Sequence, residues 1–413
     1  MSKIKVKYFG PIKEGCLEND GWIEIRKTTI FIGNQGSGKS TIAKLISTFT
    51  WIEKALFRGD YDKKWFERDN KLKNQFLNYH RLEKYFWNDD ISLDNAEIEY
   101  VGDAYHMKYE KGALLISETP NGEYPLPQIM YVPAERNFIA YVKSPKELKL
   151  SSDSLKEFLT EFDNAKKRIN RSVTLPINNA YLEYDKLNDT LNIKGEEYKI
   201  KLPEASSGFQ SLVPLYLVSS YLSHSVRKQS ESQESMSTEE MARFKKGVAD
   251  IWLNESLTDE QKRLAISALS SKFNKTAFIN IVEEPEQNLF PTSQWALLKS
   301  LLKFNNKNVG NKLIITTHSP YVINYLSIAI QAGLLKKKIS NNKKLEEKLN
   351  SVVPLKSALN SKEISIYQLN EKLGNIVELD NYNGIPSDKN LLNESLADGN
   401  HLFDSLLEIE QEI

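Results

Sequence analysis

The chain has 413 residues with 55 basic and 55 acidic side chains, so its formal net charge is zero. This balance excludes a protein held to DNA or to an acidic membrane by a uniformly basic surface, because such binding needs a field of one sign. Local patches remain possible. Residues 336–348 hold six lysines against two glutamates, and residues 390–413 hold six acidic residues and no basic one.

The remaining composition is typical of a globular protein, with 40% hydrophobic and 27% charged residues. The length suggests two or three domains, or one large domain with insertions. Cys16 is the only cysteine, which rules out an internal disulfide and favours the reducing cytoplasm. Residues 1–10 lack the apolar core of a signal peptide, and the apolar stretch 321–335 is too short to span a membrane. We therefore expect no membrane partner.

Three predicted strands open the chain and lead into a glycine-rich loop. Residues 3–9 alternate between charged and apolar side chains, which predicts a half-buried strand. Residues 22–25 and 28–32 predict two more, and the last runs directly into Gly33. After Lys39 the apolar residues recur at helical spacing. The chain is therefore predicted to begin with three strands, followed by a loop and a helix.

The next segment, residues 60–90, is basic and aromatic. A surface for single-stranded nucleic acid can have this composition. Four of its apolar residues also recur at helical spacing, which favours a helix with a buried aromatic face and a solvated basic face. Residues 96–118 predict short antiparallel strands, residues 128–132 predict a further strand, and residues 144–172 predict a charged helix.

The second half of the chain returns to buried strands. Residues 181–202 predict a hairpin, and a long helix is expected over 210–224. The polar stretch 227–240 predicts a flexible loop. Residues 278–282 and 312–316 are continuous apolar runs, which is typical of central parallel strands, with one helix between them.

These elements predict an α/β fold in which a mixed central sheet carries an antiparallel β subdomain and helical insertions. The expected units are a first part of the core (1–60), a helical insertion (61–94), a β subdomain (95–143), a helical segment (144–180), a hairpin with a helix (181–224), a second insertion (225–275), a second part of the core (276–335) and a C-terminal region (336–413).

The strongest motif is the loop Gly33–Thr41, which follows the pattern G-x4-G-K-[ST]. Its glycines let backbone N–H groups point at phosphate oxygens, and Lys39 adds a positive charge for the β- and γ-phosphates. Ser40 supplies a hydroxyl ligand for Mg²⁺. The predicted nucleotide-binding residues of this loop are Asn34, Gly36, Ser37, Gly38, Lys39, Ser40 and Thr41.

Two further signals follow predicted central strands. Glu283 and Glu284 end the strand 278–282, where one carboxylate can hold the Mg²⁺ shell and the next can polarise the water that attacks the γ-phosphate. His318 ends the neighbouring strand, where it can hydrogen-bond the γ-phosphate or the water. A weaker signal is Ser207 or Ser211 before the long helix, because a capped helix N-terminus is also an anion site.

In this order the motifs resemble the ABC-type ATPase heads of the SMC, RecF and OLD class. Gly33–Thr41 is similar to Walker A, and Glu283-Glu284 to Walker B with its catalytic glutamate. Ser207-Gly208-Phe209-Gln210 resembles the ABC signature, His318 the switch histidine, and Gln128 the Q-loop glutamine. The resemblance implies a P-loop NTPase fold of the ABC-ATPase type. Its implied ligands are ATP and Mg²⁺, with Ser207, Gly208, Gln210 and Gln128 at the nucleotide and Ser40, Glu283 and Gln128 at the metal.

Two segments make the resemblance more specific within this class. Residues 283–291 are similar to the E-E-P-E-x-H-L-x-P version of OLD-family and related anti-phage ATPases, including those of the PARIS and Septu systems, and residues 131–136 resemble a segment of the same group. Two positions depart from the usual pattern. Glu283 replaces an aspartate, and Phe209 replaces a glycine. No stretch after residue 330 resembles a Toprim nuclease, which implies that any effector is a separate protein.

The resemblance implies a homodimer, or a higher homo-oligomer, closed around ATP. Ser207 of one copy would contact the γ-phosphate held by the other, and Glu284, aided by His318, would activate water. The expected role is a cytoplasmic anti-phage sensor that controls a nuclease or toxin and responds to DNA or a phage protein. Two alternatives remain open. One is a RecF- or SMC-like DNA-repair ATPase, and the other is a nucleotide-gated scaffold with little hydrolysis.

Overall fold

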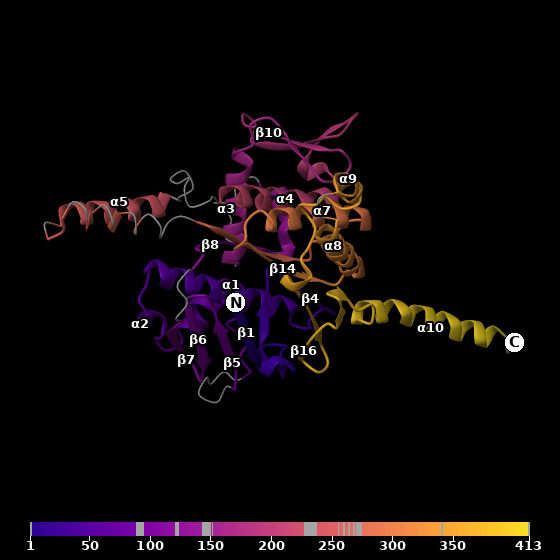
Figure 1. The fold of residues 1–413 in the computed structure, drawn as a ribbon, viewed down its shortest axis with the longest axis horizontal. Helices are drawn as coiled ribbons and strands as arrows, with labels where there is room; N and C mark the ends of the chain where they lie inside the picture. The colour runs from indigo at the N-terminus through magenta and orange to yellow at the C-terminus, as the bar shows by residue number, and fades with distance from the viewer. Residues whose placement is uncertain are drawn as a thin grey trace.

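The fold is taken from a computed structural model of the chain, shown in Figure 1. It describes residues 2–87, 95–119, 124–142, 150, 152–226, 238–254, 256–258, 261–262, 265–266, 269, 275–339 and 342–411.

A mixed sheet lies at the centre of the described part of the chain. Its strand order is β2-β16-β15-β4-β14-β13-β8, and the strands from β15 to β8 are all parallel to one another. Their bounds are Ile364–Asn370 (β15), Thr28–Gly33 (β4), Lys312–Thr317 (β14), Ala277–Glu283 (β13) and Pro127–Val132 (β8). Strand β16 (Asn375–Glu378) pairs antiparallel with β15, and β2 (Gly15–Cys16) pairs with β16.

Helices cover both faces of this sheet, which explains why its strands are continuous apolar runs. Helix α1 (Lys39–Arg58) covers one face. The other face is covered by α3 (Asp153–Lys167), α4 (Ser207–Ser225), α7 (Pro291–Asn305) and α8 (Pro320–Lys338). Successive strand residues point to opposite faces, so Ile30 and Ile32 pack into the second layer of helices while Phe31 packs against α1.

An antiparallel sheet packs on the far side of α1. Its order is β3-β1-β5-β6-β7, with bounds Ile23–Ile25, Ser2–Lys7, Glu97–Val101, Tyr105–Glu110 and Ala113–Glu118. The predicted β subdomain 95–143 is thus divided, because β8 belongs to the central sheet. The predicted hairpin is part of a separate sheet made of β9 (Val173–Thr174), β10 (Tyr181–Asp185), β11 (Thr190–Lys194) and β12 (Lys199–Lys201).

The basic and aromatic segment after α1 does not form the single helix expected from its spacing. It contains the short helix α2 (Lys63–Phe66) and a π-helix, η2 (Leu72–Leu77), and Phe86 lies beyond both, bridged to Phe9. The rings pack on one another instead of along one helical face, because Trp65, Phe66 and Phe76 form mutual contacts with ring centroids 5.1–5.8 Å apart.

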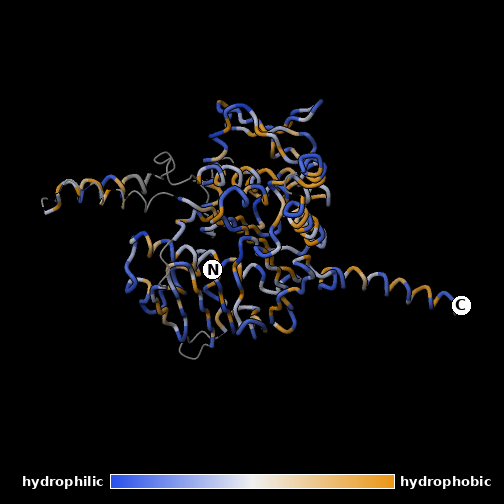
Figure 2. Tube along the Cα trace, in the orientation of Figure 1, coloured by the Kyte–Doolittle hydropathy of each residue, from blue (hydrophilic) through white to orange (hydrophobic). Residues whose placement is uncertain are grey.

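The C-terminal region, for which the sequence predicted no strand, completes the central sheet with β15 and β16. It also contains α9 (Lys343–Val352), the hairpin of β17 (Asn381–Tyr382) and β18 (Ile385–Pro386), and α10 (Leu391–Gln411). Helices α5 (Thr238–Leu253) and α10 extend from opposite sides of the body (Figure 1). Along α10, apolar and polar residues alternate and the apolar ones are exposed (Figure 2).

Several shorter helical turns connect these elements: η1 (Asn19–Gly21), η4 (Ala134–Tyr141), η6 (Leu202–Glu204) and η7 (Ser361–Glu363). The expected helix 144–172 is realised as α3, and residues 143–149 and 151 lie outside the described part. The predicted flexible loop 227–240 lies outside it except for its last residues, which begin α5. No helix of the described residues is long and apolar enough to cross a membrane.

Candidate functional site

The phosphate loop lies at one edge of the central sheet, where the parallel strands end; we call this the carboxyl edge. The loop begins at Gly33, the last residue of β4, and α1 begins at Lys39. Gly33 and Gly38 have φ angles of 150° and 102°. A Cβ atom on Gly33 would lie 2.5 Å from the carbonyl oxygen of Leu369, so the close approach of β15 requires a glycine there.

Lys39 holds the loop closed. Its Nζ donates hydrogen bonds to the carbonyl oxygens of Gly33 and Asn34, at 2.8 and 2.7 Å. The side chain is buried, and this burial lowers the pKa of Lys39 although Glu284, Glu286 and Glu283 oppose the shift. A buried ammonium surrounded by carboxylates and carbonyls is suited to exchange these partners for phosphate oxygens.

The other loop residues fall into two groups. Asn34 stabilises the turn itself: its Oδ1 accepts the N–H of Gln35 at 2.8 Å, and its Nδ2 donates to Glu371. The second group lines a cavity of about 690 Å³ that opens over the loop. Together with Lys39, it consists of Gln35, Gly36, Ser37, Gly38, Ser40 and Thr41, and the cavity is closed on other sides by Glu284 and by the aromatic residues Tyr85–Trp87.

The acidic strand end lies at the same level of the sheet as the phosphate loop. Glu283 pairs with Thr316 and Thr317 pairs with Ile32, so β13, β14 and β4 end together. Glu283 is buried; its Oε2 accepts the N–H of Ala134 at 3.3 Å, while its Oε1 has no hydrogen-bond partner among the described residues.

Glu284 reaches into the phosphate cavity from a strained backbone. Its φ is 43°, a left-handed conformation that costs a residue with a side chain about 1–3 kcal/mol. Burial raises the pKa of its carboxyl group, and the nearby His318 opposes the shift. The Nδ1 atom of His318 lies 3.6 Å from Glu284 Oε1 and has no hydrogen-bond partner among the described residues. Strain and an unsatisfied imidazole at one point are typical of a working site.

Two residues that the sequence analysis did not assign fix this acidic end. Glu286 is buried, and its Oε1 accepts hydrogen bonds from the Thr317 hydroxyl and the His318 N–H, at 2.7 and 2.9 Å. It therefore ties the end of β13 to the segment that carries His318. The Glu-Glu-Pro-Glu motif could have indicated this role. Its fourth residue, Glu286, lies in the turn after β13, from which it reaches the end of the neighbouring strand.

Arg136 is the second such residue, and it is fully buried. Its guanidinium donates to the carbonyl oxygens of Glu283 and Glu284, at 2.7 and 2.6 Å, and to those of Ser211 and Pro133. Burial lowers the pKa of Arg136 to about 10, which leaves it charged at neutral pH. One side chain thus joins the acidic strand end, the segment after β8 and the first turns of α4.

The signature-like segment begins α4. The helix starts at Ser207, three residues earlier than predicted, and its N-cap is Ser206, not Ser207 or Ser211. Gly208 approaches the turn after β13 so closely that a Cβ atom would lie 2.9 Å from the carbonyl oxygen of Asn288. Phe209 is buried at the position where glycine was expected. Ser207 itself is exposed at the start of a helix, where the first backbone N–H groups have no partner within the helix.

Gln210 does not present a free amide to a ligand. Its Nε2 donates to the carbonyl oxygens of Pro203 and Ala205, at 3.0 and 2.9 Å, and its Oε1 accepts the hydroxyl of Tyr141. The predicted nucleotide contact through this side chain is therefore replaced by a structural role: Gln210 holds the loop that leads into α4.

The prediction for Gln128 is corrected by the strand register. Gln128 is the second residue of β8 and pairs with Phe278, near the start of β13. It lies four positions before Val132, the end of the strand, which amounts to ~13 Å at ~3.3 Å per residue. It thus lies toward the opposite edge of the sheet, which we call the amino edge, and its buried side chain cannot join Ser40 and Glu283 at a metal ion.

The other two predicted metal ligands, Ser40 and Glu283, fit Mg²⁺. The described residues contain no cluster of three or more His, Cys, Asp or Glu side chains that could enclose a metal ion. Mg²⁺ at phosphates needs no such cluster, because one or two protein oxygens together with phosphate oxygens and water complete its shell. Buried oxygens without partners among the described residues, on Glu283 and Ser37, are available at this edge.

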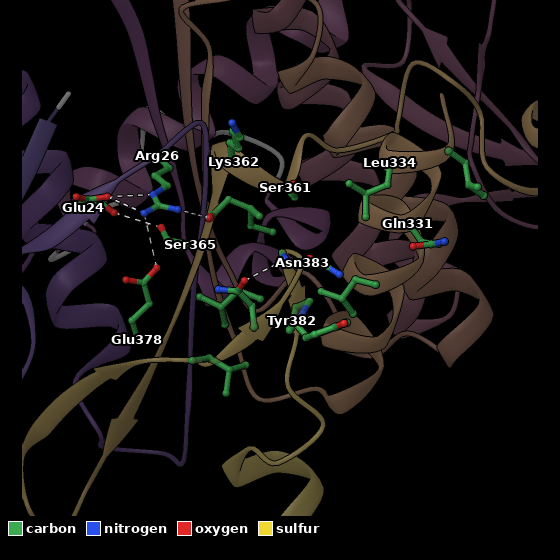
Figure 3. A pocket seen from close by; sticks show the side chains of 18 of the residues that line it. Glu24, Arg26, Gln331, Leu334, Ser361, Lys362, Ser365, Glu378, Tyr382 and Asn383 are labelled. Carbon is green, nitrogen blue, oxygen red and sulfur yellow. Dashed lines mark hydrogen bonds and ion pairs between the residues drawn. The ribbon is translucent and has the colours of Figure 1, made fainter. Parts of the chain in front are cut away.

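A cavity of about 1100 Å³ lies at the amino edge, between α8, β15 and the β17–β18 hairpin (Figure 3). The Arg26 guanidinium lies in its wall and donates to Glu24 at 2.9 Å and to the carbonyl oxygen of Ile364 at 3.0 Å, with Glu378 at 3.9 Å. These charges compensate one another, so the Arg26 guanidinium is not free to bind a ligand in the cavity.

The phosphate loop, the strand order and the shared edge of β4, β14 and β13 define a P-loop ATPase fold of the ABC type, as predicted. The chain matches the AAA ATPase domain family over residues 256–323, the segment with the acidic strand end and His318. It is also similar to endonuclease GajA of Bacillus cereus (strain HuB5-5), with 41% identity over 61 residues, which is 13% of this chain and 9% of that protein.

Solved structures with a similar fold include the SMC head domain from Thermotoga maritima, at 12% identity and a TM-score of 0.33 over 78% of this chain and 90% of that one. An SMC head bound to the C-terminal winged-helix domain of ScpA is similar at 12% identity and a TM-score of 0.37, over 92% of this chain and 97% of that one.

Proposed function

We propose that this chain binds ATP with Mg²⁺ at the carboxyl edge and hydrolyses it. One observation carries the proposal: a single cavity has the phosphate loop with Lys39 on one side and the carboxylate of Glu284 on the other. Lys39 would neutralise the β- and γ-phosphates, and Ser40 with Glu283 would hold the metal ion, which supplies charge neutralisation.

Glu284 would act as the base for the attacking water. Its raised pKa brings the carboxyl group closer to neutral pH, where a general base is more effective. His318, 3.6 Å away, would orient this carboxylate or the water, and Glu286 would position His318 through its backbone N–H. Arg136 would keep both strand-end glutamates in place through their carbonyl groups.

The site would be completed by a second copy. Ser207, at the start of α4, is exposed, while the same helical turn packs against the turn after β13 of its own chain. An exposed N-terminus of a long helix is suited to a phosphate brought by another molecule. ATP would therefore close a two-fold dimer, and hydrolysis would open it.

We further propose that this cycle switches an assembly in anti-phage defence and controls a separate nuclease or toxin. Support comes from the Glu-Glu-Pro-Glu and Pro-Ala-Glu-Arg segments and from the similarity to endonuclease GajA over 61 residues. The trigger would be DNA or a phage protein.

The test compares the wild-type chain with Glu284→Gln. We expect the variant to bind ATP, to hydrolyse it about 10²–10⁴-fold more slowly, and to elute as a dimer with ATP-Mg²⁺ in size-exclusion chromatography with light scattering. Ser207→Arg in the same background is the matched control; it should keep ATP binding and lose the dimer, because a bulky side chain would block the second copy.

Normal turnover by Glu284→Gln would refute the assigned base. Negligible hydrolysis by the wild type, with an intact ATP-dependent dimer, would indicate the nucleotide-gated scaffold. Strong stimulation by DNA with a steep salt dependence would favour the DNA-repair alternative. Co-purification with the product of the adjacent gene, lost on adding ATP, would support control of an effector.

A further inference from the structure

A separate, smaller cavity of about 240 Å³ lies beyond β8, the edge strand of the central sheet. It is enclosed by α1, the π-helix η2, β8 and α3. None of its lining residues belongs to the phosphate cavity. A π-helical turn in its wall is notable, because such turns occur often at functional sites.

The cavity has a buried floor and an open mouth. The floor is made by buried residues: Ser47, Thr48, Phe76, His80, Ile129 and Tyr131. The mouth is made by the more exposed Trp51, Gln75, Tyr79 and Glu157. The hydroxyl of Tyr79 donates a hydrogen bond to Glu157, so the carboxylate at the mouth already has a partner.

His80 is the polar group at the bottom. Its side chain is 2% exposed, and neither ring nitrogen has a hydrogen-bond partner among the described residues. The ring of Tyr131 packs against that of His80, with centroids 4.6 Å apart, while burial and the carboxylate of Glu283 raise the pKa of its hydroxyl, so this hydroxyl already faces Glu283. A buried polar group without a partner is unfavourable, so the two ring nitrogens of His80 are poised for a partner that enters the cavity.

The charge of the occupant follows from His80. Burial, together with the nearby positive charge of Lys44, lowers its pKa to about 3, so the imidazole is neutral at physiological pH. A neutral imidazole offers one donor and one acceptor. The floor holds no charged side chain that could compensate a charged ligand. An ionised occupant would therefore be buried without a counter-ion.

The shape of the occupant follows from the rings around it. Trp51 and Phe76 lie 5.6 Å apart, and His80 packs edge-to-face against Tyr79 at 4.7 Å and against Tyr131. Aromatic walls favour a planar ring, which they contact through stacked or edge-to-face geometries. We propose that this cavity binds an uncharged heteroaromatic ring of nucleobase size that has both a hydrogen-bond donor and an acceptor for the ring nitrogens of His80.

Such a ligand would touch the elements that place the nucleotide groups. Ser47 and Thr48 lie two turns along the helix that begins with Lys39. Tyr131 is followed by Val132 at the end of β8, and the N–H of Ala134 beyond it donates to Glu283. Occupation of this cavity would therefore be felt by the proposed ATPase through α1 and β8, although ring binding itself does not depend on that function.

The test uses the full chain without nucleotide and follows histidine ring signals by NMR after selective ¹⁵N labelling. Adenine and uracil are the probes, and toluene is the ring without polar groups. We expect adenine or uracil to shift the His80 signals saturably. His80→Phe, which keeps a ring and removes both nitrogens, should weaken the binding of these probes at least tenfold by calorimetry and leave that of toluene unchanged.

Gln75→Trp is the second variant, because an exposed residue at the mouth can be enlarged without disturbing the core. It should block all three probes and leave the melting temperature unchanged. Binding of adenine and uracil that is equal in the wild type and His80→Phe would overturn the proposal. So would the absence of any probe binding to the wild type, which would show that the cavity holds water only.

Discussion

The two edges of the central sheet both contain charges that are buried or half-buried, but they compensate them in opposite ways. At the amino edge, Arg26 meets Glu24 at 2.9 Å and a backbone carbonyl at 3.0 Å, so its guanidinium is satisfied within the fold. At the carboxyl edge, oxygens of Glu283 and Glu286 and the Nδ1 of His318 have no hydrogen-bond partner among the described residues.

This difference separates structural charge from functional charge. A satisfied network stabilises one arrangement, whereas each unsatisfied buried group costs about 1–3 kcal/mol until a ligand pairs it. The strained φ of Glu284 adds to the cost at the same edge. The Arg26 guanidinium is therefore not available to a ligand in the larger cavity, whereas the carboxyl edge has buried polar groups without partners among the described residues.

The largest expected effect is that of Lys39→Ala. We expect ATP binding, measured by calorimetry with Mg²⁺, to weaken by at least 100-fold, because the buried ammonium opposite Glu284 is lost. Arg26→Ala is the matched change at the amino edge and should leave the affinity within threefold. If both variants bound ATP as the wild type does, the assignment of the two edges would be wrong.

Much of the carboxyl edge could be predicted from the sequence because its signals are local. The phosphate loop directly follows a buried strand, Glu283 and Glu284 lie at the end of a second one, and His318 follows a third. Parallel strands share one edge, so these groups had to meet there. The register confirms this, since Glu283 lies beside Thr316 and Thr317 beside Ile32.

What could not be predicted depends on distant segments. Strand β15 enters between β4 and β16 from more than 300 residues away. Gln128 has a plausible residue type, but its register against Phe278 places it toward the wrong edge. Arg136 binds four backbone carbonyls from three segments, and carbonyl partners leave no side-chain pattern in the sequence.

For Arg136→Met we expect a smaller effect on ATP binding than for Lys39→Ala, and a larger effect on the stability of the fold. Removing the guanidinium leaves buried carbonyls of Glu283, Glu284 and Ser211 unpaired, which should reduce the free energy of unfolding by about 3 kcal/mol or more. Urea unfolding measures this loss. Lys39→Ala loses only two such hydrogen bonds and also removes a buried charge, so its loss of stability should be smaller. Similar unfolding midpoints for the two variants would contradict the role given to Arg136.

The smallest expected effect tests whether the charges at the amino edge are fully compensated. Glu53 on α1 is buried near that edge, and its carboxyl group accepts hydrogen bonds from the N–H groups of Ala104 and Tyr105 and from the hydroxyl of Tyr100. Burial outweighs these donors and raises the pKa of Glu53 to about 7, from an ordinary value of 4.5.

The folded protein therefore keeps a proton on Glu53 that the unfolded chain loses near pH 4.5. The stability from this proton is fully present below that pH and is lost as the pH rises through about 7. At about 1.4 kcal/mol per pKa unit, the loss amounts to about 3 kcal/mol. Glu53→Gln keeps an acceptor and cannot ionise, so its urea midpoint should change less than that of the wild type between pH 5 and pH 8. Equal slopes for the two proteins would mean that Glu53 is ionised in the fold, and that its three donors compensate it as completely as Glu24 compensates Arg26.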